Sequence, residues 1–193
     1  MYKKFLFSPN FKKNLTYVNR YIFLQKGIFM RLKIQMIPKT MYEKNVRSEL
    51  TTTDWQQLSR LIRYQAHGTC SICGAENLDL RDMDAHEVWD YIIEKKNGEK
   101  EYIQRLREIV PVCKKCHAAI HIGHTKALGK QTHTNCYERA VDHFMAVNHC
   151  GYSKFVEKER KAHKKWLKRS KHKWKLDINR DYINHLLEER VEV

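Results

Sequence analysis

Apolar residues recur at every third or fourth position in three parts of the chain, and this spacing predicts three helices. The first covers about 53–66 and opens on Thr53 to Gln56, a sequence that reads as a capping box. The second covers about 135–148. The third covers about 154–170 and has Ser153 as its candidate N-cap.

A β-hairpin is predicted between the first two of these helices. Residues 78–91 and 102–112 look extended, and the Asn97-Gly98 pair between them is the strongest short signal for a hairpin turn. Cys113 then opens a short helix that runs to about Gly123. The order strand, turn, strand and helix is a ββα unit.

Three further segments carry weaker patterns. Residues 31–37 alternate polar and apolar side chains, which predicts a strand that ends at Pro38. Residues 124–134 are polar, and we expect a loop there. The residues after 175 are net acidic and fit either a strand or a helix.

These elements predict a mixed α+β protein with a ββα core and flanking helices. The expected parts are a basic aromatic N-terminal extension (1–29), a strand and helix that pack on the core (30–67), the core (68–124), a helical region with a basic helix (125–177) and a C-terminal tail (178–193). The sequence is compatible with a start at Met1 or at Met30. A ββα unit of this size buries little apolar surface, so a bound metal would supply part of its folding free energy.

Two Cys-x-x-Cys pairs lie at the two ends of the predicted hairpin. They are Cys70 with Cys73 and Cys113 with Cys116, about 40 residues apart. Four thiolates in two such turns are the ligand set of a tetrahedral structural Zn²⁺. We therefore predict a structural zinc that joins the start of the hairpin to the start of the short helix.

The remaining composition favours a reducing compartment. Six cysteines in 193 residues are too few for a disulfide scaffold, and Cys136 and Cys150 are expected to be buried or free thiols. We find no signal peptide with a clear apolar region, and no apolar run long enough for a membrane span is expected. A cytoplasmic location fits these features.

Three histidines form a second candidate metal site. His117 and His121 are four residues apart, so they share one face of a helix. His86, on the first predicted strand, is the candidate third ligand. Because Cys116 and His117 are adjacent, the two metal sites would lie on neighbouring sides of the same helix start.

The net charge of +15 is concentrated outside the predicted core. Residues 1–42 contain nine Lys or Arg and no acid, and residues 153–175 contain eleven against two Glu, whereas residues 43–152 hold fifteen of each sign. Basic segments of this kind suit a polyanion, and nucleic acid is the first candidate. A solvated basic helix, or a membrane surface for the N-terminal segment, are the alternatives.

The segments 84–87 and 113–121 resemble the HNH endonucleases, the ββα-metal or His-Me finger class, in their four-cysteine zinc form. The residues that match the pattern of this form are Cys70, Cys73, His86, Cys113, Cys116, His117 and His121. The segments around Ile37-Pro38, Asn45 to Arg47, His86 to Trp89 and Asn148 to Gly151 also resemble a bacterial and phage subgroup. The resemblance covers about residues 30–177.

The resemblance implies roles for the residues at the core. His86 takes the position that binds the catalytic divalent cation, together with His117 and His121 on the helix. Glu87 stands where the family places the histidine that activates water, and Glu108 stands where it often has asparagine. Histidine-rich ligation fits Ni²⁺, Zn²⁺ or Mn²⁺ better than Mg²⁺.

The identity of the general base has two readings. Glu87 is one, although an ordinary glutamate has a pKa of about 4.3 and is a weaker base than histidine, and a nearby cation would lower its pKa further. Asp84 and His86 share a face of a regular strand while residue 87 points away, so the other reading makes His86 the base and Asp84 a metal ligand.

The function that these features predict is a metal-dependent endonuclease that hydrolyses phosphodiester bonds in nucleic acid, with double-stranded DNA as the expected substrate. The basic helix would hold flanking phosphates through Lys154, Lys158, Arg160, Lys161, Lys164, Lys165, Lys168 and Arg169. A zinc-stabilised nucleic-acid-binding protein without catalysis is the alternative, in which Glu87 and Glu108 are surface charges. A protein-interaction scaffold is a third reading, supported by the aromatic N-terminal extension.

Overall fold

The computed structural model describes residues 31–188, so the predicted extension over 1–29 and the end of the predicted tail lie outside the described residues. The helices and strands of the described part follow in chain order. They are α2 (Thr52–Gln65), β1 (Met83–Lys96), β2 (Glu99–Cys113), α3 (Lys114–Ile120), α4 (Ile122–Thr132), α5 (Cys136–Val147), α6 (Tyr152–Arg169), β3 (Lys175–Asp177) and α7 (Arg180–Glu188), with short 3-10 turns η2 (Lys39–Met41), η3 (Arg47–Glu49) and η4 (Leu80–Asp82). The mixed α+β class is confirmed.

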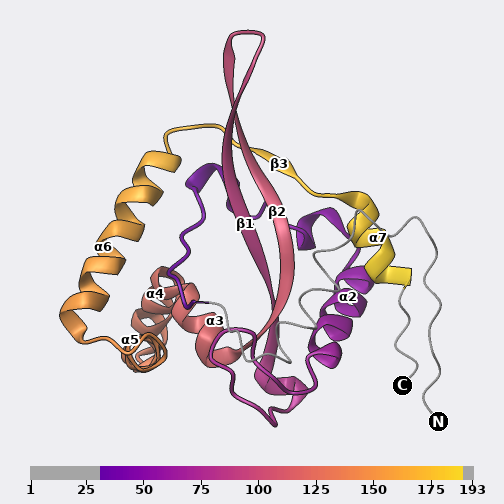
Figure 1. Ribbon diagram of the computed structural model, residues 1–193. Helices are drawn as coiled ribbons and strands as arrows, with labels where there is room; N and C mark the ends of the chain where they lie inside the picture. The colour runs from indigo at the N-terminus through magenta and orange to yellow at the C-terminus, as the bar shows by residue number, and fades with distance from the viewer. Residues whose placement is uncertain (1–30, 189–193) are drawn as a thin grey trace, which may run out of the picture.

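A long antiparallel hairpin forms the centre of the molecule (Figure 1). The Asn97-Gly98 prediction is confirmed, because both residues have positive φ (52° and 82°), as a two-residue hairpin turn requires. The strand register shifts between Val88 and Trp89, so the partner strand carries one extra residue at Arg107. β3 pairs with β2 in parallel, which leaves β1 as an edge strand.

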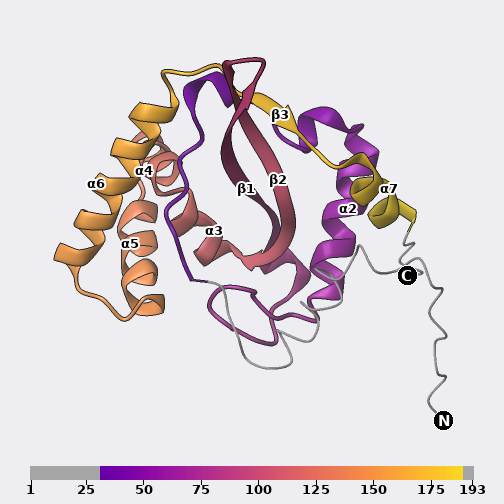
Figure 2. The ribbon, with the colours of Figure 1, turned by 45° about the horizontal axis from the view of Figure 1, so that its top comes forward.

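Two apolar clusters cover the two faces of the hairpin. In the first, Val110 and Val112 pack with residues of α3 and α5 and with Phe155 of α6. In the second, Trp89 and Leu106 pack with residues of α2 and α7. Figure 2 shows α3 to α6 on one side of the strands and α2 and α7 on the other.

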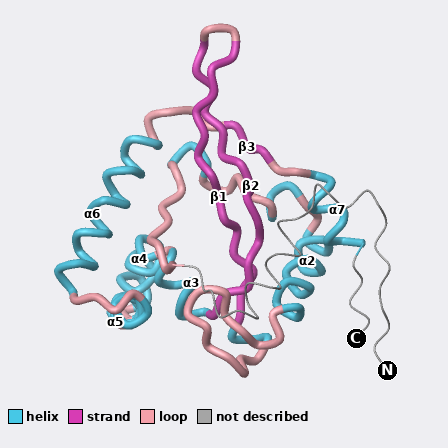
Figure 3. The backbone as a smooth tube through the Cα atoms, viewed as in Figure 1, coloured by secondary structure: helices cyan, strands magenta, loops and turns pink. Residues whose placement is uncertain are grey.

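The segment 31–37 is extended but is not a strand of the sheet in the described chain, so the strand prediction is wrong (Figure 3). Its residues instead connect the two clusters. Ile34 and Met36 pack against the first cluster, and Ile37 packs against the second. The backbone N–H of Gln35 donates to Ile120 O at 2.8 Å, which ties the segment to α3. The segment therefore passes from one face of the molecule to the other beside the edge strand.

The predicted loop over 124–134 is wrong, because most of it is α4. Ile122, Thr125 and Gly129 are buried. Thr125 Oγ1 donates to Ala118 O at 2.8 Å, and a Cβ at Gly129 would come within 3.0 Å of Cys136 Sγ. The loop prediction failed because the buried face of this helix consists of one isoleucine and two small residues in an otherwise polar segment.

The predicted helices over 53–66, 135–148 and 154–170 are present, but two of their caps differ from the prediction. Thr51, not Thr53, accepts the cap bond from Asp54 N at 3.1 Å. Gly151, not Ser153, precedes α6. The predicted tail contains the helix α7, which follows β3 in the chain. Its residues Ile183 and Leu186 are buried in the second cluster. No helix among residues 31–188 has the length and apolar character needed to cross a membrane.

Candidate metal centres

The four predicted cysteines come together at the base of the hairpin. Their Sγ atoms lie within 4.8 Å of one another, and Cys73 Sγ is 3.8 Å from Cys113 Sγ. Cys70 and Cys116 are fully buried. This arrangement is positioned to bind one metal ion and is compatible with structural zinc.

Local backbone geometry places each cysteine. Gly74 has a φ of 72° and donates its N–H to Cys70 O at 3.0 Å, which closes the first turn. Cys113 is the N-cap of α3, and its Sγ accepts from Cys116 N at 3.3 Å. Cys70 Sγ accepts from Cys113 N at 3.2 Å. Two tight turns thus aim four sulfurs at one point.

The sulfur cluster favours negative charge on Cys70. Hydrogen bonds with the Cys113 and Cys116 thiols lower the pKa of Cys70, and hydrogen bonds with Cys113 and Cys70 raise the pKa of Cys116. Metal binding requires the thiolate form of each cysteine, so a group of sulfurs that favours negative charge is suited to a soft or borderline cation. His143 of α5 lies 3.1 Å from Cys116 Sγ through Nε2, a contact that the cysteine spacing does not reveal.

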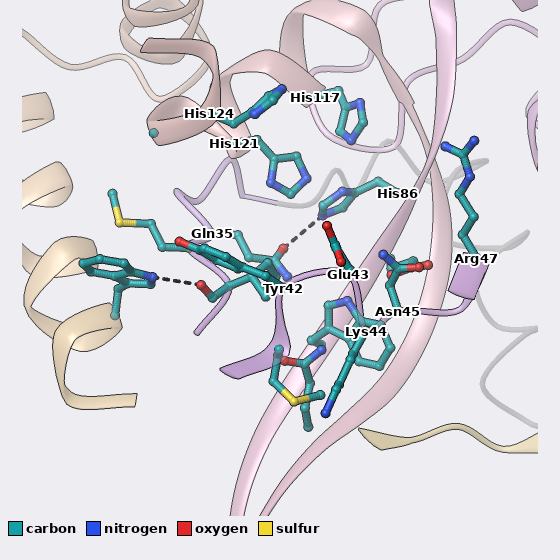
Figure 4. A pocket seen from close by; sticks show the side chains of 18 of the residues that line it. Gln35, Tyr42, Glu43, Lys44, Asn45, Arg47, His86, His117, His121 and His124 are labelled. Carbon is teal, nitrogen blue, oxygen red and sulfur yellow. Dashed lines mark hydrogen bonds between the residues drawn. The ribbon is translucent and has the colours of Figure 1, made fainter. Parts of the chain in front are cut away.

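The three predicted histidines also come together (Figure 4). One ligand nitrogen from each lies within 4.8 Å of the others. The ring centroids are 5.4 Å apart for His86 and His117, 5.1 Å for His86 and His121, and 4.9 Å for His117 and His121. His86 comes from β1 and the other two from α3 and its C-terminal end, so the hairpin and helix meet at this cluster.

Two side chains from outside the cluster hold the histidine rings. His86 Nε2 lies 3.0 Å from Gln35 Oε1, and His117 Nδ1 lies 2.9 Å from Asp84 Oδ2. Such partners leave the other ring nitrogen as a lone-pair donor. Asp84 therefore lies on the same side of β1 as His86 and contacts a histidine directly. Gln35 was not identified from the sequence.

Burial keeps two of the histidines neutral. It lowers the pKa of His86 to about 2 and that of His121 to about 4, with the neighbouring histidines adding to both shifts. The hydrogen bond from His117 lowers the pKa of Asp84. Neutral imidazoles beside an ionised carboxylate are the protonation states that a cation site needs. The donor set therefore fits a divalent ion with nitrogen preference.

Glu87 lies on the face of β1 that packs toward the second cluster. Its neighbours Ala85 and Trp89 contact that cluster, and Glu87 Oε1 accepts a hydrogen bond from Val46 N at 3.0 Å. Burial raises its pKa to about 7, contrary to the expectation of an ordinary or lowered value. Glu108 is paired with Val88 in the strand register, next to the bulge.

Another carboxylate is directed at the histidines. Glu43 has a left-handed φ of 66°, and Figure 4 shows its side chain directed from the segment before η3 toward His86. Its position in sequence, far from the histidine motif, gave no signal. Tyr42, Asn45 and His124 also surround the cluster in this view.

Some of the basic residues predicted on α6 are already paired within the protein, and others are exposed. Lys154 and Lys161 pair with Glu157 at 2.7 and 2.5 Å. The Arg169 guanidinium lies 3.7 Å from the centre of the Tyr91 ring, so it joins α6 to the hairpin. The remaining predicted contacts are mostly exposed. They are Arg160, Lys164, Lys165 and Lys168, with Lys158 half-buried.

A cavity of about 960 Å³ extends from the histidine cluster along the edge of β1. Parts of the segment 35–47, of α2, of α4 and of α6 form its other walls, and His163 and Trp166 line it from α6. The histidine site is therefore open to a space large enough for a substrate, whereas the cysteine site is buried.

Comparison with known proteins finds no matching family model, no matching curated protein and no matching solved structure.

Proposed function

We propose that this protein is a metal-dependent endonuclease that hydrolyses phosphodiester bonds, with DNA as its first candidate substrate. The observation that carries the proposal is the cluster of His86, His117 and His121 at the mouth of a large cavity, next to a separate four-cysteine cluster. The resemblance of the motif to HNH endonucleases supports the same function. A protein that needed metal only for stability would not need the second cluster.

The histidines would hold a divalent ion, which supplies electrophilic stabilisation of the phosphate and of the leaving oxygen when bound. The chain's own residues do the rest. Asp84 fixes the orientation of His117, and Gln35 fixes that of His86. The exposed lysines of α6 would attract the phosphates of a bound strand.

Two carboxylates are candidates for the group that takes a proton from water. Burial places the pKa of Glu87 near neutrality, which suits a general base, but its carboxylate is bonded to Val46 N. Glu43 is directed at the histidine cluster. His86, in the reading that makes Asp84 a metal ligand, is the third candidate.

The test is nicking of supercoiled plasmid with Mg²⁺, Mn²⁺, Ni²⁺ or Zn²⁺ added in turn. We expect metal-dependent nicking that is lost in His86→Ala. Glu87→Gln and Glu43→Gln, assayed in parallel, identify the base, since the variant that loses activity while keeping metal affinity marks it. Failure of the wild-type protein to nick DNA or RNA with any of the four ions would refute the nuclease.

A binding protein without catalysis is the second candidate. The hydrogen bond between Glu87 and Val46 N favours it, because it gives that carboxylate a role in holding η3 to the hairpin. In that case, His86→Ala would leave DNA affinity unchanged, and affinity would still fall steeply with salt.

A further inference from the structure

Two carboxamide groups beside the histidine cluster have buried atoms with no hydrogen-bond partner among residues 31–188. Gln104 of β2 is fully buried, and neither Nε2 nor Oε1 of its amide has a partner in this part of the chain. Gln35 directs its oxygen to His86, and its buried Nε2 likewise has no partner among the described residues. Both glutamines line the same cavity. Because an unpaired buried amide destabilises a protein, these groups point to a bound molecule with its own donors and acceptors.

Aromatic side chains line other parts of the cavity. Tyr42 is 56% exposed, and Trp166 is held in place by its indole N–H, which donates to Ile37 O at 2.8 Å. Trp55 lines the cavity from α2. Aromatic side chains of this kind are the surfaces on which flat rings such as nucleobases stack.

The cavity lining carries two basic side chains beside the two carboxylates of Glu43 and Glu87, and further lysines lie near it. Lys44 and Arg47 line it from the segment before and within η3, and Lys39 lies 5.2 Å above the Trp166 ring. The exposed lysines of α6 continue from the same helix that carries Trp166. A ligand that is flat and polar at its edge and anionic on its backbone matches all three features.

We propose that the cavity is a subsite for one unpaired nucleobase of the nucleic-acid strand whose phosphate lies at the histidine cluster. The base stacks against the aromatic side chains, and the amides of Gln104 and Gln35 bind its edge. This inference rests on the proposed function and names its substrate: a strand with an unstacked nucleotide at the site. A volume of about 960 Å³ is ample for a nucleotide and its neighbouring phosphates.

The hydrogen-bonding groups of a glutamine side chain suit recognition of a nucleobase edge. A carboxamide offers one acceptor and two donor hydrogens, which is the pattern that reads the edge of a base. The Tyr91 hydroxyl, opposite Gln104 in the strand register, is also buried and has no partner within residues 31–188. A single ordered water between Gln104 and Tyr91 is the competing explanation, and it predicts no effect of Gln104 on base binding.

The test compares two DNA duplexes of equal length and charge, without added divalent ion so that no cleavage occurs. One has a single unpaired nucleotide, and the other has an abasic residue at that position. Fluorescence anisotropy should show that the duplex with the base binds at least about five-fold more tightly. Tyr42→Ala and Gln104→Met should each reduce this ratio toward one. Tyr64→Ala, which removes a 48%-exposed tyrosine of α2 outside the cavity lining, should leave it unchanged.

The outcomes separate the base subsite from the nuclease itself. Equal affinity for the two duplexes would overturn the subsite, while plasmid nicking would still stand or fall on its own assay. A ratio that survives Gln104→Met would assign the unpaired amides to ordered water and remove them from the proposal. Calorimetry could instead show tight binding of a free deoxynucleoside monophosphate while the two duplexes bind equally well. That result would overturn the proposed strand and identify a free nucleotide as the ligand of the cavity. Circular dichroism and zinc content of each variant show that the fold is intact.

Discussion

The cysteine and histidine clusters are built on the same short helix in two different ways. Cys116 and His117 are consecutive residues of α3, yet their side chains belong to different clusters. Backbone amides in two tight turns place the sulfurs, and the chain closes over them. Side chains from other elements, Gln35 and Asp84, hold the histidines.

The two clusters also differ in their exposure to solvent. Cys70 and Cys116 have no exposed surface, whereas the His117 side chain is 33% exposed and faces the cavity. Structural zinc sites are closed and fully ligated by the protein, and catalytic sites keep an open position. One helix therefore presents a site suited to holding the fold together and, on its adjoining side, a site suited to reacting with a ligand.

Loss of the cysteine site should have the largest effect. Cys70→Ala removes one of four ligands at a site whose zinc would contribute about 10–16 kcal/mol to the folding of a small unit. We expect loss of cooperative thermal unfolding and of about one bound zinc per chain, measured by circular dichroism and mass spectrometry. Cys150→Ala, a cysteine outside the cluster, is the control. A Cys70→Ala protein with wild-type melting behaviour would contradict a structural role.

Loss of a histidine ligand should abolish activity and leave the fold in place. His121→Ala is expected to lower metal-dependent nicking by more than about 100-fold, since even outer partners of metal ligands contribute 10–100-fold. The melting temperature and the zinc bound by the cysteines should remain close to wild type. If zinc content fell in parallel with activity, the two clusters would not be independent sites.

The outer partners offer the sharpest contrast between the two clusters. Asp84→Asn should lower activity by about 10–100-fold with normal zinc content, because the weaker acceptor no longer orients His117. His143→Gln should do the reverse, with zinc lost more readily to a chelator and activity preserved while zinc is bound. Chelator titration followed by a colorimetric zinc assay, run beside the nicking assay, measures both.

The smallest expected effects are on the basic helix. Lys164→Ala and Lys165→Ala should each weaken DNA binding uniformly across sequences and reduce the slope of log affinity against log salt by about one. Lys161→Ala, whose ammonium is already paired with Glu157, should change the slope less. Slopes equal to the wild-type slope in all three variants would show that α6 does not contact phosphates.

Local signals in the sequence predicted the elements that hold the cysteines. The Cys-x-x-Cys spacing, the Asn97-Gly98 turn and the periodicity of the helices are each contained within a few residues, and each is present in the structure. The helix α4 was not predicted because its buried face includes Thr125 and Gly129, which are usually polar-surface or turn residues. Its burial depends on α5, and only the folded chain shows that contact.

The surroundings of the histidines could not be predicted for the same reason. Gln35 and Glu43 lie some 40–50 positions before His86 in the sequence, and no periodicity links them to it. The misread strand over 31–37 shows why. Its alternation arises because Leu32, Ile34 and Met36 all pack on the first cluster, and the same extended path brings Gln35 to His86.

The helix α6 is attached at both ends to different parts of the molecule. Phe155 at its start packs on Phe144 of α5, whose His143 contacts the cysteine cluster, and Arg169 at its end lies on Tyr91 of the hairpin. Release of zinc would loosen the first attachment, whereas the hydrogen bond from Trp166 to Ile37 O and the Arg169 contact would remain. If the position of α6 also affects the binding of a polyanion, zinc and the polyanion would be thermodynamically linked, and by reciprocity bound DNA should raise the equilibrium affinity for zinc measured against a chelator.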